Sequence, residues 1–247
     1  MEMARQLKIQ MPAETCVVIF QLDEFISAKR YDQISYLVTM HPQVRALLHV
    51  LDQTQLVLLI GHETNKRLSE PTCVHFLHTI VEQMQQRFHI NVAQAVCGSV
   101  IKSLGKIHVS YQEALDVFRL KQLLPEEMAN IYDYRNLGFY RFLPAMLEQR
   151  RLEETEHPVL AGLRDYDERN HANLVTTLEA FLKYDQNVKQ TASMLHIHVN
   201  TMLYRLKRIS EVGDFDLTNA DVKVSLYLEL LLDKLLGQGR LPPSKRS

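Results

Sequence analysis

The stretch from Asn187 to Ser210, NVKQTASMLHIHVNTMLYRLKRIS, constrains the fold most, because its pattern predicts two short helices joined by a tight turn. Asn187 is a residue type favoured at helix N-caps. The segment His196-Ile197-His198 interrupts the helical periodicity, and Ile197 is well placed to fill the joint between the helices. The second helix is expected to restart at Asn200. The apolar sides comprise Val188, Ala192 and Leu195 on the first helix, and Met202, Leu203, Leu206 and Ile209 on the second.

The other side of the second helix carries polar and basic residues related by three- and four-residue steps. No Asp or Glu occurs from Gln186 to Ser210. A short helix, a small residue at the contact, a turn and a basic second helix follow the helix-turn-helix plan of DNA-binding proteins. An ordinary solvated helix face is the alternative for the charges taken alone. The polar side comprises Thr201, Tyr204, Arg205 and Arg208, and Lys189 and Lys207 add to the positive charge.

Donor chemistry assigns roles within this DNA-binding hypothesis. Asn200 and Thr201 lie at a helix N-terminus, where side chains reach base edges or the nearest phosphate. Arg205 contacts either guanine or a phosphate, and the sequence leaves both open. His198 either touches DNA or packs and caps the helix. The full set of predicted DNA-binding residues is Lys189, Thr191, His198, Asn200, Thr201, Tyr204, Arg205, Lys207 and Arg208, of which Lys189, Tyr204, Lys207 and Arg208 are assigned to the DNA backbone.

The same stretch resembles the C-terminal helix-turn-helix of the purine-catabolism and sugar-diacid regulators, the PucR/CdaR type. Their core pattern, T-A-x-L-x-I/V-H-x-N-T-L-x-Y-R-L-x-R-I, is matched from Thr191 to Ile209. Val199 departs from the usual Arg or Pro, and Met202 from the usual Leu. The resemblance implies a regulator, usually an activator, of a catabolic operon that responds to a metabolite. It also implies that a separate sensor domain often precedes the region seen here.

The N-terminal half predicts strands and helices in the order β-α-β-β-α-β-α, the split βαβ plan of ferredoxin-like sheets. A tight turn at Asp52-Gln53-Thr54 makes the second and third strands a hairpin. The last helix of this half is expected to be capped by Ser110, with Glu113 three residues later. The expected strands are 15–22, 46–51, 55–60 and 91–100, and the expected helices are 29–40, 71–88 and 109–120. The inner face of the second of these helices is expected to be Val74, Leu77, Val81, Met84 and Phe88.

This plan is also the skeleton of nucleotidyl-cyclase and GGDEF domains, and the resembling regulators carry a degenerate version. The hairpin reads Asp52-Gln53-Thr54-Gln55-Leu56 in place of the Gly-Gly-(Asp/Glu)-Glu-Phe signature. Gln21 replaces one of the metal-binding carboxylates at the first strand. Without the glycines and the carboxylate pair, two-metal phosphoryl transfer is not expected. A divergent cyclase is therefore the weaker alternative, and the chain is predicted not to be an enzyme.

The remaining sequence predicts helices, which gives an α+β chain with an all-α C-terminal domain. Residues 129–132 are a candidate edge strand, and residues 137–152 a helix with Pro144 in its first turn or at a kink. Further helices are expected at 159–166, 171–184 and 222–236, the last with Val224, Leu228, Leu231, Leu232 and Leu235 as its apolar positions. The predicted organisation is a degenerate GGDEF-like domain at 12–124, a connecting helix and linker at 125–158, a DNA-binding domain at 159–237 and a flexible tail at 238–247.

Composition adds few constraints. The formal net charge of −1 does not oppose DNA binding, because the basic residues are concentrated locally. Cys16, Cys73 and Cys97 lie in apolar stretches without CxxC spacing, which indicates reduced buried thiols. Cys73, His75 and His78 share a helix but lack a fourth partner, so neither a metal nor another cofactor is predicted. No signal peptide or membrane-spanning run is evident, so a cytoplasmic location is expected.

The sequence thus predicts a bacterial, sequence-specific transcriptional regulator that binds double-stranded DNA. One recognition helix covers few base pairs, so a homodimer or higher homo-oligomer is expected. Self-association through the degenerate domain or the helices flanking the motif is predicted, and a small-molecule effector completes the expected partners. The alternative in another class is a protein-interaction adaptor whose helix-turn-helix no longer binds DNA, and Val199 is its only support.

Overall fold

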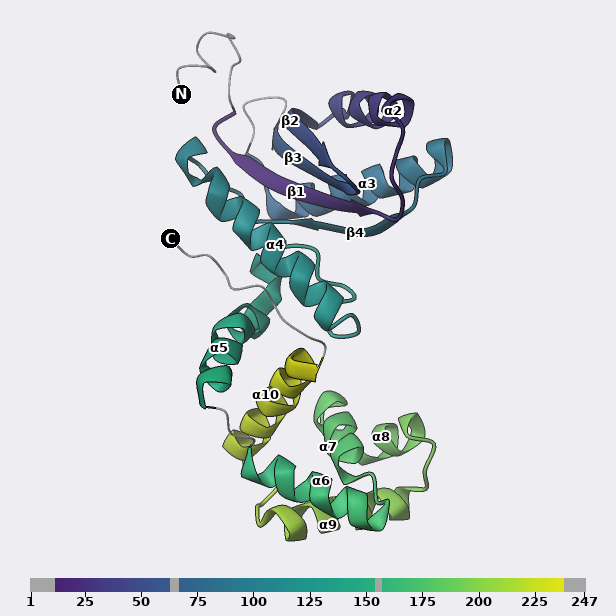
Figure 1. The fold of residues 1–247 in the computed structure, drawn as a ribbon, viewed down its shortest axis with the longest axis vertical. Coiled ribbons are helices and arrows are strands. Elements are labelled where there is room, and N and C mark those ends of the chain that lie inside the picture. The colour runs from purple at the N-terminus through teal and green to yellow at the C-terminus, as the bar shows by residue number, and fades with distance from the viewer. Residues whose placement is uncertain (1–11, 63–66, 154–156, 238–247) are drawn as a thin grey trace. The chain divides into compact units, whose positions relative to one another are not determined.

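The computed structural model describes residues 12–62, 67–153 and 157–237, and the chain divides into two compact units, residues 1–141 and 142–247 (Figure 1). The first unit combines a small sheet with helices, and the second is helical. This arrangement confirms the predicted α+β class. No helix among the described residues has the length and apolar character that crossing a membrane requires.

The sheet of the first unit has four strands in the order β2-β3-β1-β4. Every neighbouring pair is antiparallel, and β2 and β3 form the predicted hairpin with Asp52 opposite Gln55. The strands are β1 (Thr15–Leu22), β2 (Val44–Asp52), β3 (Gln55–His62) and β4 (Val92–Cys97). Helix α2 (Ala28–Thr39) joins β1 to β2, and α3 (Glu70–Phe88) joins β3 to β4. The split βαβ order predicted from the sequence is therefore confirmed.

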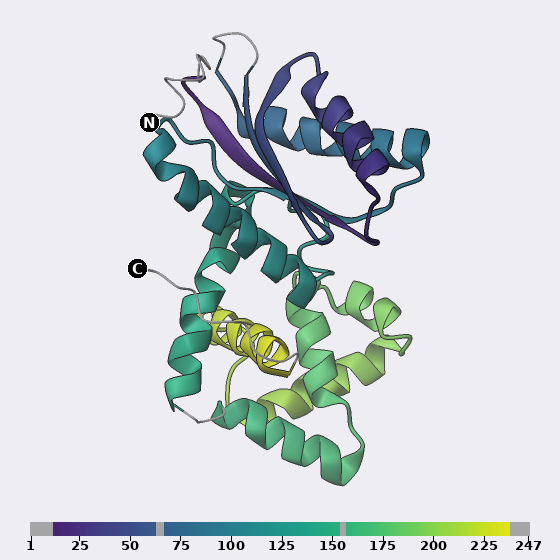
Figure 2. The ribbon, with the colours of Figure 1, turned by 45° about the horizontal axis from the view of Figure 1, so that its top comes forward.

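Helices cover both faces of β1, which explains why this strand is apolar throughout rather than alternating. Cys16, Val18 and Phe20 face α2 and α3 and belong to the main core with their buried residues. Val17 and Ile19, on the other face, are buried as well. Helix α4 (Ile107–Leu123) lies across that face and contacts β1 and β4 (Figures 1 and 2).

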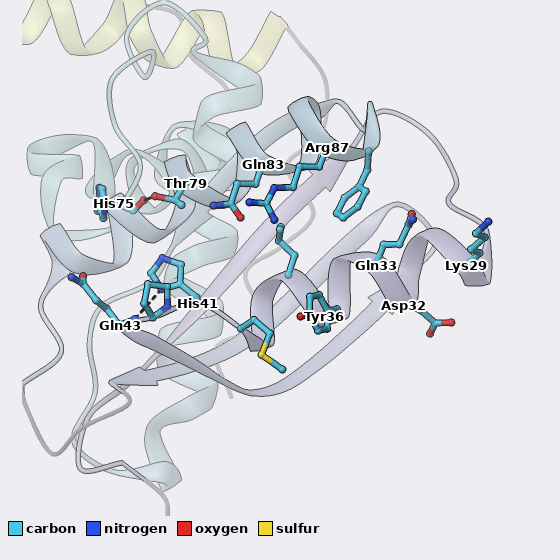
Figure 3. A pocket seen from close by; sticks show the side chains of 14 residues that line it. Lys29, Asp32, Gln33, Tyr36, His41, Gln43, His75, Thr79, Gln83 and Arg87 are labelled. Carbon is cyan, nitrogen blue, oxygen red and sulfur yellow. Dashed lines mark hydrogen bonds between the residues drawn. The ribbon is translucent and has the colours of Figure 1, made fainter.

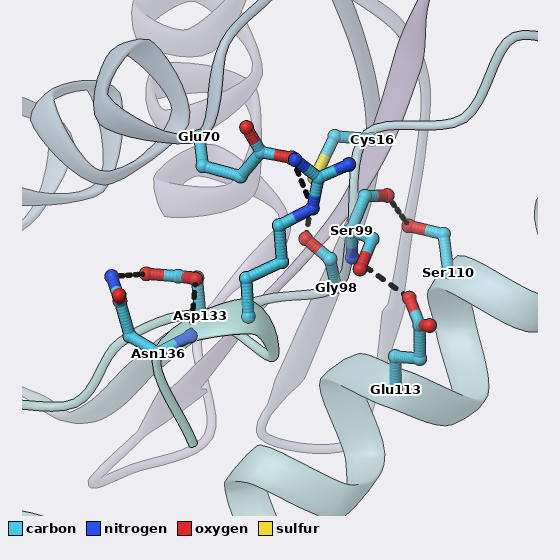
Figure 4. A network of polar contacts seen from close by, with 9 residues as sticks. Cys16, Glu70, Gly98, Ser99, Ser110, Glu113, Asp133 and Asn136 are labelled. Atoms are coloured by element: carbon cyan, nitrogen blue, oxygen red, sulfur yellow. Dashed lines mark hydrogen bonds and ion pairs between the residues drawn. The ribbon is translucent and has the colours of Figure 1, made fainter. Parts of the chain in front are cut away.

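Ser110 does not cap α4, contrary to the prediction from its spacing to Glu113. A short 3-10 helix, Leu104–Lys106, leads into α4, and Ser110 lies inside α4, fully buried. Its hydroxyl accepts a hydrogen bond from the Val17 backbone N–H at 3.0 Å. It donates one to the Ser99 carbonyl at 2.9 Å (Figure 4). The Glu113 carboxylate accepts from the Ser99 N–H at 2.9 Å. These side chains fasten α4 to β1 and to the segment that follows β4.

Gly98 permits this close approach of α4 to the sheet. A Cβ atom at this position would lie 1.9 Å from the Ser110 carbonyl oxygen, closer than any side chain tolerates. The small residue is required by the packed helix rather than by a special backbone angle.

The buried face of α3 differs from the predicted one. Leu77 and Met84 are buried as expected, whereas Val74, Val81 and Phe88 are only half-buried at the margins. The remaining fully buried positions are Cys73, Phe76 and Ile80. The sequence contains apolar residues on adjoining stripes of this helix, so periodicity alone did not fix which stripe meets the sheet.

The predicted edge strand at 129–132 is a turn followed by a single parallel bridge between Cys97 and Asp133. The Lys121 ammonium donates to the carbonyls of Met128, Ala129 and Ile131 at 2.7, 3.2 and 2.9 Å. Because the lysine binds these carbonyls, the backbone here curls around a side chain instead of extending along the sheet.

The second unit contains six helices among its described residues: α5 (Leu143–Glu153), α6 (Pro158–Asn170), α7 (Leu174–Lys183), α8 (Val188–Met194), α9 (Val199–Gly213) and α10 (Ala220–Gly237). Pro144 lies in the first turn of α5, as predicted, but the preceding residues 135–142 form a 3-10 segment kinked at Gly138. Residues 154–156 of the predicted linker and the whole of the tail predicted at 238–247 lie outside the described residues.

Helix α10 is held to α5 and α6 by charged side chains as well as by leucines. Arg150 of α5 is only 8% exposed and lies 3.4 Å from Glu229 and 3.8 Å from Asp233. Arg164 of α6 pairs with Asp233 at 2.6 Å. The buried positions of α10 are Leu226, Leu230, Leu231, Leu232 and Leu235, whereas Val224, predicted to be apolar core, is exposed.

Candidate nucleic-acid interface

Helices α8 and α9 and the turn between them form the predicted helix-turn-helix. The Asn187 side chain accepts from the Gln190 N–H at 3.0 Å, which confirms it as the N-cap of α8. His196 adopts a left-handed conformation in the turn, and the Ile197 N–H donates to the Ala192 carbonyl at 3.0 Å. Ile197 packs against the small core of Phe181, Ala192 and Met202, as expected for the residue that fills the joint.

His198 is the N-cap of α9, which begins at Val199, one residue earlier than predicted. Its Nδ1 accepts from the Asn200 N–H at 3.2 Å. The structure shows the capping role of this histidine, and its contact with DNA stays a prediction. The His198 side chain is exposed at the N-terminus of α9, as is Asn200.

Leu203 is exposed, contrary to its predicted place on the apolar side of α9. Its side chain is 51% exposed, whereas Met202 and Ile209 are completely buried. Leu203 continues a stripe that runs from Asn200 through Tyr204 to Lys207 in steps of three and four residues. The outward face of α9 is therefore amphipathic, with one large apolar side chain among polar ones.

Arg205 and Arg208 turn away from this outward stripe, so the predicted polar side divides into two faces. The Arg205 guanidinium donates to the Thr177 hydroxyl of α7 at 3.1 Å. The Arg208 guanidinium lies 4.7 Å from the Tyr166 ring centre, on α6, and donates to Glu211 at 2.8 Å. The hydrogen bonds to Glu211 and Tyr166 raise the pKa of Arg208. Both arginines thus lie along the flank where α9 meets α6 and α7.

Thr191 is completely buried, which corrects its assignment as a DNA contact. Its hydroxyl donates to the Asn187 carbonyl at 2.8 Å, inside the contact between α8 and its neighbours. Lys189, two residues earlier, is exposed. A threonine hydroxyl can donate a hydrogen bond to a DNA phosphate, but Thr191 lies on the inner face of α8, where its hydroxyl binds the protein backbone.

A hollow of about 400 Å³ opens beside the recognition helix α9. Sequence reasoning missed the half of this hollow that α6 and its C-terminus supply, because these residues lie outside the acid-free window. Thr201, Tyr204, Arg205 and Arg208 line it from α9, and Tyr166, Asn170, His171, Ala172 and Leu174 from the other side. Two guanidinium groups, two phenols and an amide thus border one concave surface adjoining the outward stripe.

At the position of the degenerate nucleotide site, two of the polar side chains bind protein groups. The Gln21 amide donates to the Thr54 hydroxyl at 2.7 Å, so it ties β1 to the hairpin turn. Glu24 pairs with Arg30 at 2.6 Å, and Asp23 is exposed beside it. Among the residues that the structure describes, no three His, Cys, Asp or Glu side chains are grouped to hold a metal ion.

Comparison with known protein families matches both units. Residues 1–120 match the GGDEF-like domain and residues 174–232 match the PucR C-terminal helix-turn-helix domain. The chain is of the PucR/CdaR type. The resemblance stated from the motif is thereby confirmed.

Three bacterial proteins are similar to this PucR/CdaR-type chain over much of its length. The DNA-binding transcriptional activator AdeR of Bacillus subtilis (strain 168) is 32% identical over 227 residues, covering 92% of this chain and 53% of AdeR. The proline-responsive transcriptional activator PutR of the same organism is 29% identical over 203 residues, 82% of this chain and 46% of PutR. The carbohydrate diacid regulator of Escherichia coli (strain K12) is 34% identical over 158 residues, which cover 62% of this chain and 37% of the regulator. This chain spans about half the length of AdeR and PutR.

Proposed function

We propose that this PucR/CdaR-type chain is a sequence-specific DNA-binding transcriptional regulator, an activator of a catabolic operon that responds to a metabolite. The observation that carries the proposal is the outward face of α9 from Asn200 to Lys207, which is exposed, carries no Asp or Glu and lies beside a hollow bordered by two arginines. Such a face matches the major groove, where base edges are flanked by phosphates. AdeR and PutR are activators by name, and PutR is named as proline-responsive.

The proposed reading face consists of Asn200, Thr201 and Leu203. Asn200 and Thr201 offer hydrogen-bonding groups at the helix N-terminus, and the exposed Leu203 offers an apolar surface to a thymine methyl group. Tyr204 and Lys207, on the same stripe, are assigned to base edges or the nearest phosphates.

The proposed backbone contacts come from the flanks of the reading face. Arg205 and Arg208 are anchored on α7 and α6, which supports phosphate contacts rather than base readout. The exposed Lys189 on α8 supplies a further cation. His198 contributes mainly by capping α9.

The assignment predicts different losses for different residues. Asn200→Ala should weaken binding to the operator by about 1–3 kcal/mol while leaving random DNA almost unaffected. Arg205→Ala should weaken binding to operator and random DNA equally, as expected for a phosphate contact. Fluorescence anisotropy on both duplexes distinguishes the two, and a loss confined to the operator for Arg205→Ala would reassign it to base reading.

Two copies of the chain are proposed to bind one operator, because a single recognition helix reads only a few base pairs. A monomeric mass at micromolar concentrations together with unchanged operator affinity would contradict this. We further propose a cytoplasmic location, where the chromosome lies, and no catalytic activity. The domain division at 12–124, 125–158 and 159–237 is kept as a proposal, with the connecting segment shared between the two compact units.

One observation favours the adaptor alternative. Met194 and Leu203 are 52% and 51% exposed, and apolar side chains on an outward face also suit a protein partner. An adaptor would show no DNA binding even at low salt, whereas the proposed regulator binds strongly under those conditions.

A further inference from the structure

A groove of about 800 Å³ runs between α2 and α3 in the first unit (Figure 3). Its volume lies in the range of small-molecule sites. Leu37 is buried within it, Phe88 is half-buried, and His41 is 9% exposed. Polar side chains of both helices stand along the rim, as Figure 3 shows.

Several of these polar side chains have no side-chain partner among the residues that the structure describes. Gln33 of α2 and Gln83 and Arg87 of α3 line the groove, and none makes a hydrogen bond or ion pair with another described residue. Gln83 and Arg87 lie side by side on α3 (Figure 3). Two other polar side chains of this unit do have partners: Arg30 pairs with Glu24, and the Gln21 amide donates to the Thr54 hydroxyl.

The charges of the groove favour an anion. Lys29 and Arg87 are its cations and Asp32 is its carboxylate, with Lys29 and Asp32 both on the first turns of α2. Arg87, near the end of α3, therefore remains uncompensated. A guanidinium binds a carboxylate through two parallel hydrogen bonds, and adjacent amides serve as donors and acceptors for further polar groups.

We propose that the groove between α2 and α3 binds a small organic carboxylate. Arg87 binds the carboxylate, Gln33 and Gln83 bind a neighbouring polar group, and the apolar part of the ligand lies against Leu37 and Phe88. This proposal rests on the metabolite response proposed above and locates that response in the GGDEF-like unit. The buried apolar surface favours a ligand with a hydrocarbon body over inorganic phosphate.

The test is direct binding to the purified chain, measured by ligand-observed NMR and isothermal titration calorimetry. The probes are short monocarboxylates, dicarboxylates and α-amino acids, each paired with its neutral amide, with inorganic phosphate as a further probe. At least one carboxylate should bind with Kd below about 1 mM. Its amide should bind about ten-fold more weakly, since a charge-assisted hydrogen bond is lost.

Two substitutions connect this binding to the groove. Arg87→Gln and Gln83→Ala should each weaken binding of that carboxylate, by about ten-fold for Arg87→Gln. Arg45→Gln is the matched control, because Arg45 is an exposed arginine on β2 that does not line the groove. The control should bind like the unmodified chain, and all three variants should keep its unfolding midpoint, since the replaced side chains are surface groups.

Three results would overturn the proposal: no carboxylate of the panel binds, Arg87→Gln binds as well as the unmodified chain, or phosphate binds better than every carboxylate. A DNA-binding assay on the same sample separates the two proposals. DNA binding without carboxylate binding refutes the groove alone. Carboxylate binding without DNA binding refutes the regulatory function and leaves the groove as a ligand site.

Discussion

Leu203→Ala tests whether the apolar side chain on the outward face of α9 reads DNA. Leu203 is 51% exposed in the chain alone, so about half of its surface remains to be covered by DNA. Fully burying a leucine side chain contributes about 1.5–3 kcal/mol, so half of that is about 1 kcal/mol. The substitution should therefore weaken operator binding about five-fold.

The decisive comparison removes the thymine methyl group of the DNA instead of the leucine side chain of the protein. Replacing one contacted thymine with deoxyuracil deletes one methyl group, which contributes about 0.8 kcal/mol or about four-fold in affinity. The unmodified chain should lose this amount at one or two positions of each half-site. Leu203→Ala should be almost insensitive to deoxyuracil at the same positions, because the two contacting groups are then both absent.

The assay is fluorescence anisotropy at constant salt, with thymines of the operator replaced one at a time. Val224→Ala is the matched control, because Val224 is an exposed apolar residue on α10, outside the helix-turn-helix. Equal affinity of the unmodified chain for thymine and deoxyuracil at every position would refute the reasoning. So would an equal methyl effect in Leu203→Ala.

Three further predictions concern the scaffold. Ser110→Ala removes two hydrogen bonds and leaves a buried strand N–H unpaired, so urea unfolding should show a loss of stability of about 2–4 kcal/mol. Ser103→Ala is the control and should change stability little, because Ser103 is an exposed serine of the same unit. Arg150→Ala leaves two carboxylates facing a buried site and should lower the free energy of unfolding by about 3–5 kcal/mol. Arg151→Ala is the control, because its partner is a half-exposed neighbour one turn away, and it should lower that free energy by about 1 kcal/mol or less. Equal losses would show that burial of the Arg150 ion pairs contributes nothing. The hydrogen bond with a neighbouring cysteine and burial raise the pKa of Cys73, so iodoacetamide at pH 8 should leave its thiol unmodified in the folded chain and alkylate it in denaturant; rapid native alkylation, seen by mass spectrometry, would contradict the buried placement.

Local sequence predicted the parts of this chain whose partners are also local. Asn187 caps α8 through an amide three residues away, and Ile197 fills a joint between two helices of the same motif. The hairpin predicted at Asp52 depends on a short turn between two strands, and the structure contains it, with Asp52 opposite Gln55. In each case the residues that decide the structure lie within a few positions of one another.

Sequence failed where a residue distant along the chain decides the outcome. Ser110 and Glu113 have the spacing of a capping box, but β1 and the segment after β4 offer them buried backbone groups instead. Arg205 belongs to the polar side of α9 by periodicity, yet Thr177 of α7 holds it at the flank. Leu203 is predicted to be core because it is apolar, although its side chain remains half-exposed in the part of the chain that the structure describes. Periodicity gives the faces of a helix and does not tell which face its neighbours cover.

Selection of DNA from a library of genomic fragments by the purified chain, repeated at several salt concentrations, tests the central claim most directly. The account predicts enrichment of a two-fold-symmetric sequence whose affinity falls steeply with salt, by a slope of about −0.9 for each phosphate contacted. Its half-sites should be about one helical turn apart, as two symmetric recognition helices require. The absence of any enriched sequence, with no binding even at low salt, would contradict the DNA-binding function.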